Sequence, residues 1–150
     1  MNKITPFLWF DKQAGEAAHF YVSIFKNSSI TKIRGSGDAI SGVSFVLDGQ
    51  EFHALNGGPM FQFNPAISMY VNCETQAEVD DLWDKLSAGG TPQRCGWLQD
   101  KYGLSWQIIP TILPALLQDP DAKKAERARM AMMKMVKIDI ETLKRASEEI

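Results

Sequence analysis

Few side chains in this chain are suited to metal or nucleophilic chemistry. Its two histidines are His19 and His53, and its two cysteines are Cys73 and Cys95. Two histidines so far apart indicate neither a two-histidine, one-carboxylate iron site nor a nucleophilic triad. Arg94 neighbours Cys95, but in an extended strand it points to the opposite face, so it does not favour a reactive thiolate. We therefore interpret His19 as solvent-facing and Cys73 as structural, do not assign Cys95 as a catalytic thiolate, and keep His53 as a candidate pocket residue.

Composition excludes several classes of partner. The chain has 150 residues, with 16 Lys and Arg against 18 Asp and Glu, so its formal net charge is −2. No basic stripe offers the footprint that nucleic-acid phosphates require. No apolar run approaches the roughly 20 residues that span a bilayer, and the first residues lack the layout of a secretory signal. Two cysteines make no disulfide framework, so we expect a cytoplasmic protein. From the charge and the apolar runs we expect neither a nucleic-acid nor a membrane partner.

The first half of the chain predicts a strand, a helix, a second strand and a hairpin. Residues 4–10 are apolar with no helical period, and residues 30–34 form another short apolar run. Between these two strands, four residues recur at the spacing of one helix face: Ala17, Phe20, Tyr21 and Ile24. The hairpin comprises 43–47 and 51–55 around Asp48-Gly49, a dipeptide that tolerates the positive φ angles of a type I′ turn.

That turn fixes the expected register of the hairpin. With Asp48-Gly49 as the loop, the predicted pairs are Leu47–Gln50, Phe45–Phe52 and Val43–Ala54. One face then carries Val43, Phe45, Phe52, Ala54 and Asn56. The other carries Ser44, Val46, His53 and Leu55.

The same order of elements returns in the second half. A strand is predicted over 66–71, a helix over 76–86, and a strand pair over 94–99 and 104–109. At an offset of 62 residues, Phe20 meets Leu82 and Tyr21 meets Trp83, so the two halves match in pattern. We predict an α+β fold of paired βαβββ modules in a single domain. Module one spans about 1–62, module two about 63–110, and a helical extension about 111–150.

Prolines and two aspartates organise the predicted extension. Pro110, Pro114 and Pro120 interrupt any long element, whereas Asp121 and Asp139 stand where N-caps of two helices belong. The first of these helices carries a narrow apolar stripe of Ala125, Ala128, Met132 and Met135. Such a stripe needs a surface to cover, either on this chain or on a second subunit.

Seven stretches of the sequence resemble a known family. They are ITPFLWFD at 4–11, EAAHFYVSIF at 16–25, LDGQ at 47–50, ALNGGP at 54–59, CGWLQD at 95–100, GLSWQ at 103–107 and KIDI at 137–140. With the βαβββ plan, they resemble PhnB-like proteins of the vicinal-oxygen-chelate superfamily, which carry a 3-demethylubiquinone-9 3-methyltransferase domain. The resemblance implies the glyoxalase/bleomycin-resistance/dihydroxybiphenyl dioxygenase fold. The methyltransferase name lacks support from motifs, because no glycine-rich turn joins the first strand to the first helix.

The resemblance also implies where a metal would be held. Metal-dependent relatives use His, Glu or Gln from the first and last strand of each module. Here the final signature reads D-x-x-G-x-x-x-Q, so Gln107 takes the place of a glutamate. The first-strand window 5–7 and the fifth-strand window 66–68 contain no His, Glu or Gln. At most His53 and Gln107 remain, so we predict no bound metal and no other cofactor.

A curved sheet carrying many aromatic residues predicts a pocket for a small molecule. The resemblance implies that Gln107 faces inward, so that Ser105 and Ile109 share its face and Trp106 points to the helices. Candidate ligand-binding residues are Trp9, His53, Asn56, Ser105 and Gln107, acting by stacking and neutral hydrogen bonding. The expected function is metal-independent binding of an aromatic or quinone-like molecule by a homodimer, with any reaction unassigned. The alternatives are a non-catalytic sequestering protein of bleomycin-resistance type and a metal-dependent lyase or dioxygenase.

Overall fold

Unit 1 of the computed structural model is a four-stranded sheet with one long helix. The model describes residues 2–149, and its chain divides into two compact units, Met1–Phe63 (unit 1) and Asn64–Ile150 (unit 2). The elements of unit 1 are β1 (Phe7–Phe10), α1 (Ala14–Ile24), β2 (Ser29–Arg34), the short 3-10 helix η1 (Gly37–Ala39), β3 (Gly42–Leu47) and β4 (Gln50–Asn56). The strand order is β1-β4-β3-β2, with β1 parallel to β4 and the other pairs antiparallel.

The β3–β4 hairpin has the predicted register. All three expected pairs are present: Leu47–Gln50, Phe45–Phe52 and Val43–Ala54. At the turn, Asp48 has φ 47° and Gly49 has φ 81°, the left-handed conformation that a type I′ turn requires at both positions. The register decides which side chains reach the core. The rings of Phe45 and Phe52 stack with their centroids 5.3 Å apart, and the ring centroid of Tyr21 in α1 lies 6.3 Å from that of Phe45.

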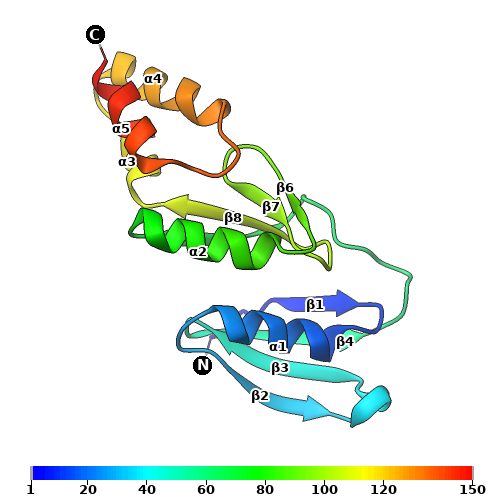
Figure 1. Ribbon diagram of the computed structural model, residues 1–150. Helices are drawn as coiled ribbons and strands as arrows, with labels where there is room; N and C mark the ends of the chain where they lie inside the picture. The colour runs from blue at the N-terminus through cyan, green and yellow to red at the C-terminus, as the bar shows by residue number, and fades with distance from the viewer. Residues whose placement is uncertain (1, 150) are drawn as a thin grey trace. The chain divides into compact units, whose positions relative to one another are not determined.

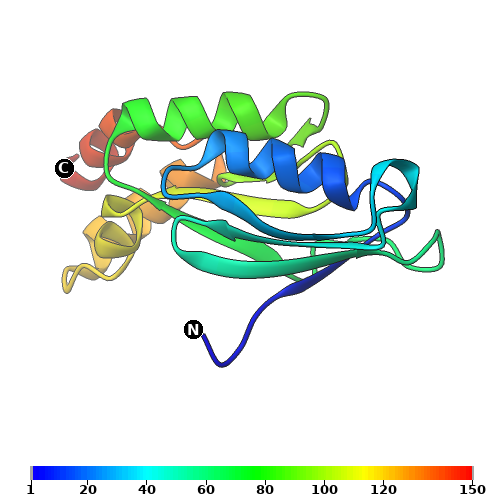
Figure 2. The same cartoon turned by 90° about the horizontal axis from the view of Figure 1, so that it is seen from below.

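Helix α1 covers one face of this sheet, as Figures 1 and 2 show. Its buried side chains are Ala14, Ala17, Ala18 and Tyr21. Small alanines let the helix approach the sheet closely, and Tyr21 fills the space over the hairpin. The predicted helix is therefore confirmed, although Phe20 is only partly buried. The opposite face of the sheet carries Ser44 and His53, which are paired across β3 and β4.

Unit 2 repeats the topology of unit 1 and adds three helices. Its elements are β5 (Ser68–Cys73), α2 (Gln76–Ser87), β6 (Thr91–Pro92), β7 (Trp97–Gln99), β8 (Ser105–Pro110), α3 (Ile112–Leu117), α4 (Ala122–Met133) and α5 (Ile140–Glu148). The strand order β5-β8-β7-β6, with β5 parallel to β8, matches that of unit 1 strand for strand. The predicted βαβββ duplication is confirmed. Helix α2 packs on this sheet through the predicted face of Val79, Leu82, Trp83 and Leu86 (Figure 1).

Asp100 organises the turn between β7 and β8. It is buried, and one carboxylate oxygen accepts hydrogen bonds from the backbone N–H groups of Tyr102 (2.8 Å) and Leu104 (3.1 Å). The other oxygen accepts the indole N–H of Trp106 at 2.9 Å. A buried carboxylate is tolerable when donors surround it. This network holds Trp106 on the helix side of β8, as predicted, and turns Gln107 to the other face.

The strand expected over 94–99 begins only at Trp97, so its first three residues were wrongly assigned. Cys95 has φ 61° and Gly96 has φ 81°, which takes the chain out of extended geometry. Their N–H groups donate to the carbonyl oxygens of Met135 (2.9 Å) and Val136 (2.8 Å) instead of to a sheet neighbour. A β-carbon on Gly96 would lie only 2.8 Å from Ile109 Cδ1 of β8 and 3.0 Å from Ile138 Cγ1 of the extension. The close approach of both segments therefore requires glycine here.

The extension contains the two predicted caps and one helix that the sequence did not predict. Asp121 accepts from the N–H groups of Lys123 and Lys124 at the start of α4, and Asp139 accepts from Thr142 at the start of α5. Helix α4 ends at Met133, so Met135 falls outside the predicted stripe. Helix α3 was missed because of Pro114. This proline is the third residue of the helix, where a backbone N–H has no partner within the helix, so it does little harm.

Helix α2 holds the extension through the side chain of Gln76. Its amide nitrogen donates to the carbonyl of Ile138 (3.0 Å), and its amide oxygen accepts the N–H of Ile140 (2.8 Å). Ile138 and Leu143 are fully buried in a cluster with Ile109 and Leu113. The extension is therefore part of the core of unit 2. Within residues 2–149, no helix is both long and apolar enough to cross a membrane.

Candidate functional site

The five predicted ligand-binding residues fall in both units. Trp9, His53 and Asn56 belong to unit 1, and Ser105 and Gln107 belong to unit 2. In unit 1, the parallel pairs Phe7–His53 and Trp9–Leu55 put Trp9 and His53 on the same face of the sheet. Asn56 points to the face that α1 covers. The structure thus separates Asn56 from the other two.

Asn56 fastens the start of α1. Its side-chain oxygen accepts the N–H of Ala14 at 2.8 Å, and its amide nitrogen donates to the carbonyl of Ile40 at 2.9 Å. The first turn of a helix has N–H groups without partners in the helix, and Asn56 satisfies one of them. Asn56 also lines a cavity of about 320 Å³ together with Lys12, Gly15, Glu16, Gly37, Asp38 and Ile40. Both signs of charge occur there, so the cavity favours no one class of ion.

Trp9 lies against a glycine loop. Its indole N–H donates to the carbonyl of Gly58 at 2.9 Å, and its ring meets Phe61 edge to face at 4.9 Å. A β-carbon on Gly57 would lie 2.4 Å from the indole, so the loop passes directly over the ring. The polar group of Trp9 is therefore used by the scaffold.

His53 ends a short polar chain that sequence reasoning did not identify. Its Nδ1 lies 2.7 Å from the hydroxyl of Ser44, and Arg34 Nη1 lies 3.4 Å from the same hydroxyl. The ring of Phe7 packs on the imidazole at 5.5 Å. The hairpin register already places Ser44 opposite His53, so this contact could have been read from the sequence. Within residues 2–149 no carboxylate hydrogen-bonds this imidazole, so the pair lacks the third group of a triad.

In unit 2, Gln107 stands at the centre of a row of side chains that we call the β5-β8-β7 row. Tyr70 pairs with Gln107 across β5 and β8, and Trp97 pairs with Gln107 across β8 and β7. The Gln107 amide nitrogen donates to the Ser68 hydroxyl at 2.9 Å, which orients the amide. The Tyr70 side chain is 48% exposed, and its partial burial moves the pKa of the hydroxyl up from a value that already keeps it protonated at neutral pH. The row presents neutral polar groups between aromatic rings.

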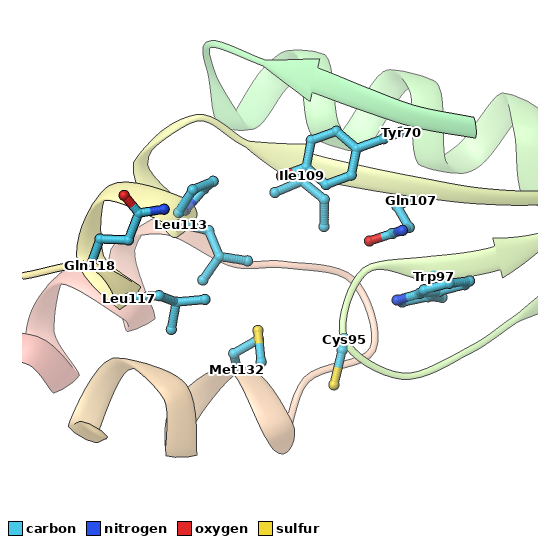
Figure 3. A pocket seen from close by; sticks show the side chains of 10 residues that line it. Tyr70, Cys95, Trp97, Gln107, Ile109, Leu113, Leu117, Gln118 and Met132 are labelled. Carbon is cyan, nitrogen blue, oxygen red and sulfur yellow. The ribbon is translucent and has the colours of Figure 1, made fainter. Parts of the chain in front are cut away.

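The β5-β8-β7 row forms one wall of a cavity of about 340 Å³. Figure 3 shows Tyr70, Gln107 and Trp97 on the sheet side and Leu113, Leu117 and Met132 on the helix side. The complete lining is Tyr70, Cys95, Trp97, Gln107, Ile109, Leu113, Pro114, Leu117, Gln118 and Met132. Of the five predicted residues, this cavity includes Gln107 alone. The nine other lining residues were not predicted to bind a ligand, because most of them lie in turns and in the extension.

Ser105 and the two cysteines take different roles from Gln107. Ser105 is fully buried and outside the cavity lining, and its hydroxyl makes no hydrogen bond to the described residues. Cys73 is also fully buried, and burial with the nearby Glu78 and Glu74 raises the pKa of its thiol to about 12. It therefore carries no thiolate at neutral pH, in agreement with a structural role. Cys95 contributes to the cavity wall.

The cavity lining is uncharged, which limits what it can bind. None of its ten residues is acidic or basic. Transfer of a charge into such surroundings is costly unless an opposite charge compensates it. Apolar walls with a few oriented polar groups are typical of sites for neutral small molecules. The geometry suits hydrogen bonding and stacking and offers no strong acid or base.

The strand pairs that would hold a metal do not provide a suitable set of donors. His53 is paired with Phe7, and Gln107 is paired with Tyr70. Each unit thus offers one His or Gln side chain and no carboxylate at these pairs. Among residues 2–149, no group of three or more His, Cys, Asp and Glu side chains lies together in a way that could hold a metal ion. A divalent ion needs more and better donors than these.

Comparison with known structures agrees with this fold. The PhnB protein from Bacillus cereus is 37% identical, with a TM-score of 0.69, and the match covers 73% of this chain and 100% of that one. Protein PA1353 from Pseudomonas aeruginosa is 19% identical, with a TM-score of 0.62 and coverage of 73% and 98%. The fosfomycin resistance protein FosX from Listeria monocytogenes, crystallised with Mn(II) and sulfate, is 17% identical, with a TM-score of 0.54 and coverage of 70% and 88%. The last two show a common fold alone.

The family model described as 3-demethylubiquinone-9 3-methyltransferase matches residues 2–109. No functionally curated protein matches the chain. The match spans both βαβββ modules and ends within β8, before the extension. This chain therefore belongs to the PhnB-like 3-demethylubiquinone-9 3-methyltransferase family, within the glyoxalase/bleomycin-resistance/dioxygenase fold.

Proposed function

We propose that this protein binds a small, neutral, aromatic or quinone-like molecule in the unit 2 cavity without the help of a metal. The observation that carries the proposal is the β5-β8-β7 row, in which the oriented amide of Gln107 lies between Tyr70 and Trp97 at the wall of an uncharged cavity. A flat ring would lie against the aromatic side chains, and its carbonyl or hydroxyl would bind the amide.

The size of the cavity favours a molecule of about two rings. A dry apolar cavity of about 150 Å³ accepts benzene, and this one measures about 340 Å³. Small-molecule sites begin at about 300 Å³. A carbonyl at one end would accept the remaining N–H of Gln107, whose other N–H is used by Ser68. The rest of the molecule would meet apolar side chains.

Two other activities have less support. FosX was crystallised with Mn(II), but the donors at the corresponding strand pairs of this chain do not suit a divalent ion, which argues against a metal-dependent lyase or dioxygenase. Methyl transfer of the usual kind needs a glycine-rich turn from a strand into a helix. Between β1 and α1 the chain reads Asp11-Lys12-Gln13, with no glycine. We therefore propose ligand binding and not methyl transfer.

A thermal-shift experiment tests the proposal with 1-tetralone, a neutral two-ring ketone, and with 1-naphthoate, a two-ring anion. Tetralone is chosen because quinones add to thiols and Cys95 lines the cavity. At about 100 times its Kd, tetralone should raise Tm by about 8 °C, whereas naphthoate should leave Tm unchanged. Gln107→Ala should weaken tetralone binding about tenfold.

The matched control is Gln93→Ala, the same substitution in unit 2 but outside the cavity. It should bind tetralone like the wild type. Trp9→Ala, in unit 1, asks separately whether that predicted residue takes part in binding. No shift with tetralone, or equal binding by wild type and Gln107→Ala, would contradict the proposal.

Whether the bound molecule is sequestered or converted is a separate question for the same site. A sequestering protein returns its ligand unchanged, whereas an enzyme yields a product that mass spectrometry detects after incubation. We also propose that the chain forms a homodimer. Light scattering at micromolar concentration should then give twice the 16.8 kDa mass of the chain, and a monomer there would contradict it.

A further inference from the structure

The cavity of unit 2 is built half by the family domain and half by the extension. The family match ends at Ile109. Five of the ten lining residues lie at or before Ile109, and the other five come after it in the chain. The later five are Leu113, Pro114, Leu117, Gln118 and Met132, from α3, the residue after it, and α4. A chain that ended with β8 would present the β5-β8-β7 row without its opposite wall.

We infer that the extension selects the ligand of this cavity, because Leu117 and Met132 set the size of the apolar group that fits opposite Gln107. This inference rests on the proposed function and adds which part of the chain distinguishes one ligand from another. The polar contact would be made by the family domain, and the apolar end of the ligand would meet the extension. Ligands that share a ring and a carbonyl but differ at the far end would then bind differently.

The polar and apolar groups are separated in the way this inference needs. Figure 3 shows Gln107 and Tyr70 on the strand side and the tips of Leu113, Leu117 and Met132 across the cavity. Gln118, which is exposed, lines the cavity together with Leu113 and Leu117. A two-ring ketone with its carbonyl at Gln107 would direct its opposite carbon at Leu117 and Met132.

The extension is held firmly enough to act as a wall. The Gln76 amide makes two hydrogen bonds to the backbone at Ile138 and Ile140. The N–H groups of Cys95 and Gly96 bond to the carbonyls of Met135 and Val136, just after α4. Leu113 is 3% exposed and shares a buried cluster with Ile138. Because β8, α2 and the 95–96 turn all anchor the extension, the positions of Leu117 and Met132 are set by the fold of unit 2.

The two side chains should differ in how strictly they select. Leu117 is branched and has few rotamers, so it defines a fixed boundary. Met132 is unbranched and flexible, so it adapts to different shapes. In a closely packed pocket, one extra methylene group changes affinity about tenfold or more when the walls cannot move. Shortening or enlarging either side chain should therefore alter which ligand is preferred.

The test compares 1-tetralone with 4,4-dimethyl-1-tetralone, whose two methyl groups lie across the ring from the carbonyl. Isothermal titration calorimetry gives both Kd values for the full-length wild type and for each variant. Met132→Ala and Leu117→Ala should shift the ratio of the two Kd values about tenfold toward the dimethyl compound. Leu117→Phe makes the cavity smaller and should shift the ratio toward unsubstituted tetralone. With three variants, the inference can still be tested if one alanine variant fails to fold.

The matched control is Met133→Ala, because Met133 is the neighbouring methionine of α4, is 50% exposed and does not line the cavity. It should leave the ratio unchanged. Gln107→Ala should weaken both compounds equally and also leave the ratio unchanged. If the three extension variants keep the wild-type ratio while Gln107→Ala still weakens both ligands, the extension does not select and the proposed function stands. If neither compound binds the wild type, both proposals are contradicted.

Discussion

The two units have the same strand topology but carry different side chains at equivalent positions of their sheets. Each unit has a row that crosses its first, last and third strands: Phe7, His53 and Ser44 in unit 1, and Tyr70, Gln107 and Trp97 in unit 2. In unit 1 the imidazole of His53 is bonded within the row, to Ser44. In unit 2 the amide of Gln107 is oriented by Ser68 from outside the row.

The segment after the last strand of each unit accounts for the difference. After β4, the chain runs into the Gly57-Gly58 loop that receives Trp9. After β8, the chain runs into α3 and the rest of the extension, whose side chains stand opposite the row. A duplicated scaffold thus gives two similar sheets, and the added helices turn one of them into a cavity. Function in such a fold depends on what is attached to the sheet as much as on the sheet.

The largest expected effect comes from Gly96, where the extension meets the sheet. Gly96→Ala puts a β-carbon 2.8 Å from Ile109 Cδ1 and 3.0 Å from Ile138 Cγ1, at a φ of 81°. Overpacking and left-handed strain together should lower the free energy of unfolding by about 3 kcal/mol. Urea unfolding measures this loss, and tetralone binding should weaken with it because the opposite wall is displaced.

Gly103→Ala is the matched control, because Gly103 also has a positive φ (89°) but has nothing within 4 Å of the added β-carbon. It should cost only the conformational strain, about 1 kcal/mol. Equal losses of stability for the two variants would mean that Ile109 and Ile138 move away from the added methyl group at no cost. The position of the extension would then not depend on a glycine at residue 96.

A pair of serine variants tests whether the two rows act independently. Ser68→Ala removes the hydroxyl that orients Gln107 and should weaken tetralone binding about threefold. Ser44→Ala removes the partner of His53 and should lower stability by about 1 kcal/mol without changing tetralone affinity. Calorimetric titration and urea unfolding give both quantities for each variant. Should Ser44→Ala weaken binding as much as Ser68→Ala, ligand binding would involve the unit 1 row and the contrast between the units would fail.

The sequence predicts local structure and register well wherever one short motif fixes them. Asp48-Gly49 sets the phase of β3 and β4, and every later pair in the hairpin is determined because side chains alternate. Asp121 and Asp139 predict helix starts because their side chains accept helix N–H groups. The repeat of the βαβββ order predicts two similar sheets, although the short strand β6 (Thr91–Pro92) was not predicted and the strand order comes from the structure.

The cavity was beyond sequence reasoning because it is assembled from distant segments. Tyr70 and Met132 line the same cavity, although 62 positions separate them. Nothing in the local pattern shows that Cys95 leaves the strand or that Pro114 sits harmlessly in the first turn of α3. Gln107 was found because its strand face is given by alternation and its position by the resemblance. Its neighbours in the cavity required the course of the extension.

The smallest effect is expected from the ion pair between the extension and α2. Lys137 Nζ lies 2.9 Å from Asp80 Oδ1, and both side chains are more than a third exposed. The hydrogen bonds from Gln76 and Lys137 hold the pKa of the Asp80 carboxyl below its ordinary value of 3.8. A lowered pKa in the folded state means that the carboxylate contributes stability above pH 3.8, and that this contribution is lost as the pH falls below it.

The contribution should be below about 0.5 kcal/mol, because solvent and salt screen an exposed pair. Asp80→Asn should therefore lower stability slightly at pH 7 in low salt, and should match the wild type in 0.5 M NaCl or at pH 3. Urea unfolding at these conditions measures the difference. The matched control is Asp81→Asn, which removes an exposed ion pair with Lys85 within the same helix and leaves the contact with the extension intact. A loss above about 2 kcal/mol would show that charge holds the extension to unit 2. The attachment of the extension, which distinguishes unit 2 from unit 1, would then depend on ionic strength. Burial of Ile138 and the hydrogen bonds of the Gln76 side chain would not be its main cause.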